Sequence, residues 1–247
     1  MRALGKLAFT QTKLYLRDPM SVFFTIAFGP IYLILMGVIF GNNPQDIFGG
    51  RGQMDITLTA FIALVIGITG LTAVPIGAAL RRETGVLRRL SATPLKPLTY
   101  FLADIAAPFV VILLGITLMI ALGFILFHVS FVGNWFSLAG GIILSIAAFF
   151  AVGYLIAGLV PNSRTAVILG NVLIIPMNIF SGAAVPLEIM PETIRTIAQY
   201  NPLTHAVTLL RGLWFGEAWS AHLLELAVLS GLLILCTVVV ALTFKWE

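Results

Sequence analysis

The chain has 247 residues, of which 60% are hydrophobic and 10% are charged, and its formal net charge is +4. Soluble globular domains usually carry about 45–50% apolar and about 25% charged residues, and disordered chains are polar and highly charged. A mean hydropathy of +1.06 therefore argues against both classes and for an integral membrane protein. The single cysteine, Cys236, excludes an intramolecular disulfide framework and a cysteine-based zinc cluster.

Residues 1–18 are predicted to form an amphipathic helix on the membrane surface. Arg2, Lys6, Lys13 and Arg17 fall on one side of such a helix, and mainly apolar residues fall on the other. Basic amphipathic helices lie at the boundary between lipid headgroups and water. The pattern leaves two roles open, a simple membrane anchor and a docking surface for a partner.

The rest of the chain is dominated by long stretches without Asp, Glu, Lys or Arg. A helix needs roughly 20 apolar residues to cross the hydrocarbon core, and one of these stretches is long enough for two crossings. We therefore predict an all-α fold with six transmembrane helices in one domain over residues 1–247. The predicted spans are about 21–40, 57–80, 105–127, 137–160, 165–185 and 221–244.

The basic residues are distributed unevenly between the two sides of these spans. All of them except Arg51, Arg195 and Arg211 fall on the side that holds both termini. Cytoplasmic loops carry the excess of Lys and Arg in membrane proteins. We therefore expect a multi-pass protein of a cell membrane with both termini in the cytoplasm, and we attribute the positive charge to topology and not to nucleic-acid binding.

The longest predicted cytoplasmic loop, residues 81–104, is both basic and partly apolar. Arg81, Arg82, Arg88 and Arg89 share one face of a helix, whereas Glu83 lies on the apolar face with no basic residue three or four positions away. We expect Glu83 to pair with a basic group on the N-terminal helix or on another protein. A solvated loop that only sets topology leaves the apolar stripe unexplained, so we favour a short amphipathic helix that grips another protein.

The segment from 186 to 221 is neither a full span nor a plain loop. Short helices are predicted from about 191 to 200 and from about 203 to 215, separated by Asn201-Pro202. Each is too short to cross a membrane, so we expect interfacial or re-entrant helices that cap the outer mouth of the bundle. The alternative is a passive aromatic belt at the interface.

The sequence lacks the groups that common enzymes and ion-coupled transporters use. It has no G-x-x-x-x-G-K-[ST] phosphate loop, so we expect no ATP hydrolysis and no other enzymatic activity from this chain. No His, Cys or acidic residues have metal-ligand spacing. The predicted spans hold no ionisable side chain in their middles apart from Cys236, which argues against proton- or ion-driven transport. Energy for any pumping must then come from another subunit.

Mildly polar side chains do occur within the predicted spans. Thr69 and Thr72 lie in the second, and Asn171 and Asn178 lie seven residues apart on one face of the fifth. We expect these four residues to line a substrate path. Hydrogen bonding between helices is the alternative for each of them.

Three stretches resemble bacterial ABC-2 type permeases. Residues 7–37 resemble their N-terminal helix and first span, residues 81–104 resemble their cytoplasmic signature, and residues 180–216 resemble the segment around the fifth span and the outer helices. Among these permeases, the daunorubicin-type drug exporters are the most similar. The residues that match in the cytoplasmic signature are Glu83, Gly85, Leu90, Thr93 and Pro94, and those in the outer segment are Gly182, Pro186, Pro191, Asn201, Pro202, Leu203 and Arg211.

The resemblance implies the membrane subunit of a bacterial ATP-binding-cassette exporter in the inner or plasma membrane. Its partners would be two ATPase subunits, which hold ATP and Mg²⁺, and a second permease copy or a related permease. The second and fifth spans would line the path, and Gly182, Pro186, Pro191, Asn201 and Pro202 would belong to the outer gate. The residues expected to couple to the ATPases are Arg81, Arg82, Glu83, Gly85, Leu87, Arg88, Arg89, Leu90, Thr93 and Pro94.

The mild polarity of the predicted path favours an amphiphilic or apolar cargo, such as a drug-like or lipid-like molecule. Export of a polysaccharide or a lipid-linked polymer by the same architecture is an alternative. A membrane assembly or sensor protein without transport is an alternative of a different class. An adjacent gene for a phosphate-loop ATPase would favour the exporter.

Overall fold

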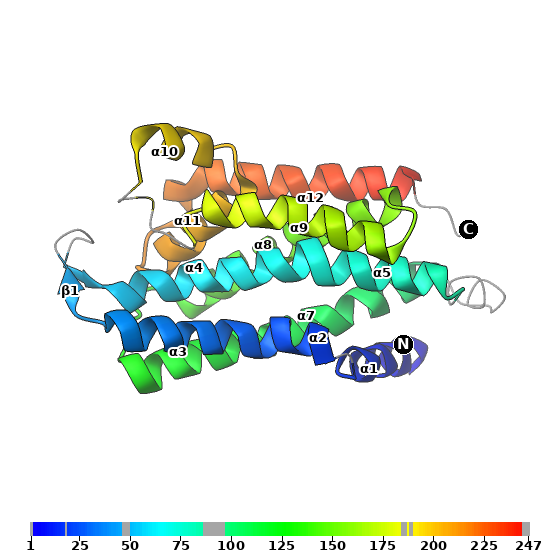
Figure 1. Ribbon diagram of the computed structural model, residues 1–247, viewed down its shortest axis with the longest axis horizontal. Coiled ribbons are helices and arrows are strands. Elements are labelled where there is room, and N and C mark those ends of the chain that lie inside the picture. Colours follow the sequence, from blue (N-terminus) through cyan, green and yellow to red (C-terminus); the bar gives the residue numbers. More distant parts are fainter. Residues whose placement is uncertain are drawn as a thin grey trace.

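The computed structural model describes residues 2–17, 19–45, 50–85, 97–183, 187 and 190–243. The described chain is an all-α bundle whose long helices run side by side along the longest axis of the molecule (Figure 1). The N-terminal helix and the end of the last helix lie at one end of the bundle, which we call the terminal end. A short two-stranded hairpin and the helix α10 lie at the other, which we call the hairpin end (Figure 1).

After the N-terminal helix, the helices up to residue 83 form two nearly continuous rods. The helices of this part are α1 (Arg2–Tyr15), α2 (Pro19–Val22), the π-helical η1 (Phe23–Ala27), α3 (Phe28–Phe40), α4 (Gln53–Ile68), the π-helical η3 (Thr69–Ala73) and α5 (Val74–Glu83). Strands β1 (Pro44–Gln45) and β2 (Arg51–Gly52) pair antiparallel between α3 and α4. After residue 96 follow α7 (Pro97–Phe127), α8 (Trp135–Leu159), α9 (Ser163–Ile179), α10 (Glu192–Ala198), α11 (Pro202–Trp214), the 3-10 turn η5 (Trp219–His222) and α12 (Leu223–Thr243).

Four of the described helices are long and apolar enough to cross a membrane: Gln53–Glu83, Ala103–Phe127, Trp135–Leu159 and Trp219–Leu242. Two further apolar helices, Thr25–Phe40 and Ser163–Ile179, are shorter. The predicted all-α membrane architecture is thus confirmed, whereas the number of six spans stays a prediction. The fifth predicted span reached residue 185, but α9 ends at Ile179 because a turn follows in which Gly182 has a φ of +81°, a conformation that glycine adopts without a steric penalty.

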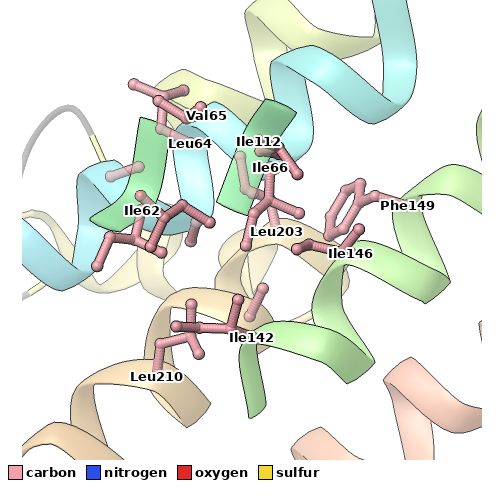
Figure 2. Close-up of a cluster of buried hydrophobic side chains, with 14 of the residues drawn as sticks. Ile62, Leu64, Val65, Ile66, Ile112, Ile142, Ile146, Phe149, Leu203 and Leu210 are labelled. Atoms are coloured by element: carbon pink, nitrogen blue, oxygen red, sulfur yellow. The ribbon is translucent and has the colours of Figure 1, made fainter. Parts of the chain in front are cut away.

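The centre of the bundle is the continuous helix Gln53–Glu83, whose apolar stretch is 78% buried, against 11% for the last helix. Figure 2 shows side chains of α4, including Ile62 and Ile66, beside Ile112 of α7, Ile146 of α8 and Leu203 of α11. All five of these side chains are buried. An apolar helix buried on every side needs no amphipathic pattern, and this is why the second predicted span shows none.

The π-helical segment η3 lets two neighbouring helices approach the central helix closely. Pro75 has no backbone N–H and cannot bond the Leu71 carbonyl four residues before it. A Cβ atom added at Gly170 of α9 would lie 2.4 Å from that carbonyl oxygen, and one added at Gly153 of α8 would lie 2.1 Å from the oxygen of Gly70. Only glycine fits at these two crossings, so α8 and α9 are held against the central helix just before its last turns.

Polar side chains organise the hairpin end. The buried carboxylate of Asp55 accepts hydrogen bonds from the backbone N–H groups of Gly52 (3.2 Å) and Ser130 (2.8 Å). The Asn42 side-chain oxygen accepts one from Met54 N–H at 2.9 Å. These contacts fix the start of α4 to the loop between α7 and α8.

Candidate functional site

The candidate site is the last turn of the central helix, where three consecutive charged residues stand at the terminal end of the bundle. Helix α5 ends at Glu83, and Thr84 and Gly85 form a turn in which Gly85 has a φ of +68°. The helix predicted over residues 81–90 is therefore not continuous, because its first residues complete the central helix and a glycine turn follows. Leu87, Arg88, Arg89, Leu90, Thr93 and Pro94 lie outside the described residues.

The first charged residue, Arg81, is tied to α7 and α8 through a buried carboxylate. Its Nη2 donates a hydrogen bond of 2.7 Å to Asp104 of α7, and the hydroxyl of Tyr154 of α8 donates one of 2.9 Å to the same oxygen. The Asp104 side chain is only 4% exposed. Buried charges in membrane helices are expensive unless they are paired, so this triad joins three helices at one point.

Asp104 corrects the sequence analysis, which placed this residue at the end of a loop. Helix α7 begins at Pro97, so Asp104 lies two turns inside it and within the apolar helix Ala103–Phe127. Its partner Arg81 is 23 positions away in sequence. The sequence offered one signal for this pairing. Asp104 stands at the start of one apolar stretch, and Arg81 and Arg82 stand at the end of the stretch before it.

The second charged residue, Arg82, binds the end of α8. Its Nη1 donates to the carbonyl oxygen of Ala157 at 3.0 Å, and its Nη2 donates to that of Val160. The last four carbonyl groups of a helix have no partner within the helix, and a cation at this end is also favoured by the helix dipole. Arg82 supplies both the donors and the charge.

The third charged residue, Glu83, binds the start of α9. Its carboxylate accepts hydrogen bonds from the backbone N–H (2.7 Å) and the hydroxyl (2.8 Å) of Ser163, the first residue of that helix. Helix N-termini present free N–H groups and favour an anion. Sequence reasoning expected a basic partner for Glu83. Among the described residues its hydrogen bonds go to Ser163, because a helix N-terminus satisfies a carboxylate as a cation does.

A cavity of about 190 Å³ lies beside the Arg81–Asp104 pair. Gln11 and Tyr15 of α1 line one side of it, and Asp104 and Tyr154 line another. Tyr15 also shares a hydrogen bond of 2.9 Å with Thr25 of the first apolar rod. The N-terminal helix therefore lies over the buried ion pair at the terminal end of the bundle.

The four residues predicted to line a substrate path lie in different surroundings. Thr69 is buried within η3, and the Thr72 hydroxyl donates to the Ile68 carbonyl of its own helix at 2.6 Å. Asn171 is exposed on α9, and Asn178 is half-buried on the same helix. The Thr72 side chain lies beside Gly170, the residue before Asn171, and the role of the four residues in a path stays a prediction.

The predicted outer segment forms the two short helices expected of it. Pro191 precedes α10, and Pro202 is the first residue of α11. The side-chain oxygen of Asn201 accepts a hydrogen bond from Leu203 N–H at 3.0 Å, and its amide donates to the Met177 carbonyl at 2.7 Å. Asn201 thus caps α11 and ties it to the end of α9. Pro186 lies outside the described residues.

Most of helix α11 is buried against the rest of the bundle, and its position in a membrane stays a prediction. Ten of its residues are buried, Trp214 among them, and Trp214 Nε1 donates to the Ser130 carbonyl at 2.8 Å. In the described part of the chain, no three His, Cys, Asp or Glu side chains are grouped so that they could hold a metal ion.

Comparison with known proteins agrees with this arrangement. Residues 3–215 match the ABC-2 type transporter family. The chain is 25% identical over 239 residues to the probable doxorubicin resistance ABC transporter permease protein DrrC of Mycobacterium tuberculosis, which covers 93% of this chain and 83% of that protein. It is 26% identical over 209 residues to the putative transport permease YvfS of Bacillus subtilis, over 83% of this chain and 82% of that protein.

A further relative, the probable multidrug ABC transporter permease YbhR of Escherichia coli, is 23% identical over 159 residues, which are 64% of this chain and 43% of that protein. The family match spans most of the chain and includes the central helix, its charged last turn and α11. The chain therefore belongs to the ABC-2 type transporter family and is a membrane-embedded permease subunit of an ABC transporter.

Proposed function

We propose that this chain is the transmembrane subunit of an exporter that moves an amphiphilic or apolar, drug-like or lipid-like cargo. The observation that carries the proposal is the family match over residues 3–215. It is supported by the alignment with a relative named for doxorubicin resistance, which covers 83% of that protein. The sequence has no phosphate loop. ATP and Mg²⁺ would therefore be bound by separate ATPase subunits, two per transporter, below two permease chains.

The segment 81–94 is the proposed contact with those ATPases. It begins in the last turn of the most buried of the four long apolar helices, and its described part ends at Gly85, two residues beyond that helix. A displacement of the segment by an ATPase would act on the whole central helix. An ATP-bound partner that binds one permease conformation more tightly would thereby shift the population toward that conformation.

The proposed path runs along the central helix and α9 and is lined by Thr69, Thr72, Asn171 and Asn178. Hydroxyl and amide groups suit a cargo with few charges. The capped, buried helix α11 would close the outer end of the path together with α10.

The proposed orientation, with both termini and Thr84 in the cytoplasm, rests on the distribution of basic residues. Cysteines introduced at Gln45 and Ser220 should react with a membrane-impermeant thiol reagent added to intact cells, whereas a cysteine at Thr84 should react only after lysis. The background variant Cys236→Ala controls for the native thiol. Labelling of Thr84→Cys in intact cells would contradict the orientation.

The transport proposal is tested by reconstitution into liposomes with the ATPase encoded beside the permease gene. We expect ATP-dependent movement of doxorubicin, the probe suggested by the named relative, and no ATP hydrolysis by the permease alone. A complex whose ATPase carries a substituted phosphate-loop lysine is the control. Doxorubicin is one member of the proposed cargo class, so a set of amphiphilic cations and lipid analogues extends the test. ATP hydrolysis by the permease alone, or a complex that moves none of these compounds, would refute the proposal.

A further inference from the structure

The turn between α8 and α9 is held at both of its ends by two neighbouring side chains of another helix. Only residues 160–162 separate Leu159 of α8 from Ser163 of α9. Arg82 donates to two carbonyl groups on the α8 side of this turn, and Glu83 accepts from two donors on the α9 side. We call Arg82 and Glu83 the clasp.

The clasp matches both the hydrogen-bonding needs and the charge of the helix ends that it holds. The end of α8 presents free carbonyl groups and partial negative charge, and the start of α9 presents free N–H groups and partial positive charge. A guanidinium meets the first and a carboxylate meets the second. Reversing either residue type would place a like charge at a helix end, so the order Arg-Glu is specific to this turn.

Geometry makes the clasp a mechanical connection between segments that are far apart in sequence. Glu83 and Ser163 are 80 positions apart, and the clasp closes the last turn of α5 directly onto the junction of two other long helices. The end of α5 cannot move away from the turn without breaking these four hydrogen bonds. Arg82 and Glu83 thus stand at the start of the proposed ATPase-contacting segment, and Gly85 follows within two residues.

We propose that Arg82 and Glu83 are positioning residues of the transport cycle, which make the α8–α9 turn follow the end of the central helix when an ATPase displaces the segment after it. The inference rests on the proposed function, because it presupposes that an ATPase acts on this segment. Through the clasp, a displacement at the terminal end reaches α9, the helix that carries Asn171 and Asn178.

The exposure of the clasp separates this role from a purely stabilising one. Glu83, Thr84 and Asn162 at its edge are exposed to solvent. Solvent-exposed ionic contacts contribute little to the stability of a folded protein. The loss of the exposed Glu83 carboxylate should therefore leave the amount of folded protein nearly unchanged and alter the transfer of motion instead, whereas Arg82 is half-buried and its loss should also cost some stability.

The experiment measures doxorubicin transported per ATP hydrolysed in liposomes that contain the permease and its ATPase. Glu83→Gln removes the charge and keeps the shape, and Arg82→Gln removes the guanidinium. Arg164→Gln and Glu192→Gln are matched controls, because both residues are charged and exposed but lie outside the clasp. We expect each clasp variant to lose at least about fivefold in transport per ATP, which is the lower end of typical coupling between sites. The controls should match wild type, and Glu83→Gln and the controls should melt within about 2 °C of it.

A covalent link in place of the clasp tests the connection directly, because transport per ATP should recover when positions 83 and 163 are joined again. In a Cys236→Ala background, Glu83→Cys alone should transport poorly. The pair Glu83→Cys and Ser163→Cys, joined by a short bis-methanethiosulfonate reagent, should recover transport per ATP and lose it again on reduction. The same reagent applied to either single variant is the control.

Four outcomes would overturn the clasp inference while wild type transports normally: clasp variants that transport like wild type, controls that lose as much as the clasp variants, clasp variants that fail to fold, or cross-linking that restores nothing. A wild-type complex without any ATP-driven transport would instead refute the proposed function, and the clasp inference with it.

Discussion

The buried carboxylate of Asp104 allows a quantitative test of how the terminal end of the bundle is held together. One of its oxygens accepts hydrogen bonds from Arg81 and Tyr154, and the Arg81 side chain is 26% exposed. Asp104→Leu removes the acceptor for both donors and leaves a largely buried guanidinium without this counter-charge. Breaking a buried ion pair from one side costs about 3–5 kcal/mol. Because Arg81 retains some contact with solvent, we expect the lower end, about 3 kcal/mol of unfolding free energy.

Two companion variants separate the charge from the hydrogen bond. Tyr154→Phe removes one hydrogen bond to a charged group, which is worth about 1.5–3 kcal/mol. The double variant Arg81→Met with Asp104→Leu removes both charges together. Replacement of a whole buried ion pair by apolar side chains is often neutral or stabilising, so the double variant should be more stable than Asp104→Leu alone.

The assay is reversible unfolding of the purified permease in mixed micelles, followed by tryptophan fluorescence. It is applied to Tyr154→Phe and to the cycle of Asp104→Leu, Arg81→Met and their double variant. The expected signature is an interaction free energy of about 2–3 kcal/mol between positions 81 and 104. If Asp104→Leu unfolds within about 0.5 kcal/mol of wild type, the reasoning is refuted, because surface substitutions have effects of that size. If the double variant is as unstable as Asp104→Leu, the lost unfolding free energy comes from altered packing and not from the Arg81 charge that has lost its partner Asp104.

Three further variants test other contacts. Gly153→Ala should lower the melting temperature and the yield, because a Cβ there would lie 2.1 Å from the Gly70 oxygen; a melting temperature equal to wild type would show that the helices separate freely. Asn201→Ala should lose about 1–2 kcal/mol of unfolding free energy, because it loses the helix cap and the hydrogen bond to the Met177 carbonyl. Asn201→Asp retains the cap and should lose less in the same assay. Trp214→Phe keeps the aromatic packing and removes one indole hydrogen bond, so a loss of about 1 kcal/mol is expected by chemical unfolding, and a loss above about 3 kcal/mol would place the main contribution in ring packing.

Local chemistry explains which parts of the fold were predictable from sequence. The two short helices α10 and α11 are predictable because Pro191 is a start signal and Asn201-Pro202 is a break, and the structure shows that Asn201 and Pro202 also begin α11, as its cap and its first residue. The long helices were predicted from their apolar length alone. Both depend on residues that are adjacent in the chain.

The contacts of the charged residues were not predictable, because each joins positions that are distant in sequence. Asp104 was assigned to a loop on the rule that charges mark span ends, and only its pairing with Arg81 and Tyr154 explains why it lies inside a helix. Glu83 has its partner in Ser163, 80 positions away. Polar residues of the spans were ambiguous for a further reason: a hydroxyl such as that of Thr72 bonds the carbonyl of its own helix, so its presence does not indicate a path.

The π-helical segment at Thr69–Ala73 has a consequence for how this helix tolerates changes in length. Segments of this kind carry a local excess of backbone over regular helix, and each residue of an α-helix turns the chain by about 100°. Removal of one residue from the segment would take up this excess and leave a regular α-helix, so Arg81, Arg82 and Glu83 would still face their partners. Removal of one residue from the regular helix between Val74 and Leu80 would instead rotate these three residues by about 100°. A substitution within the segment leaves this phase intact. The number of residues in the regular helix between Val74 and Arg81 therefore sets the direction in which the charged turn faces, whereas the π-helical segment can lose one residue without changing it.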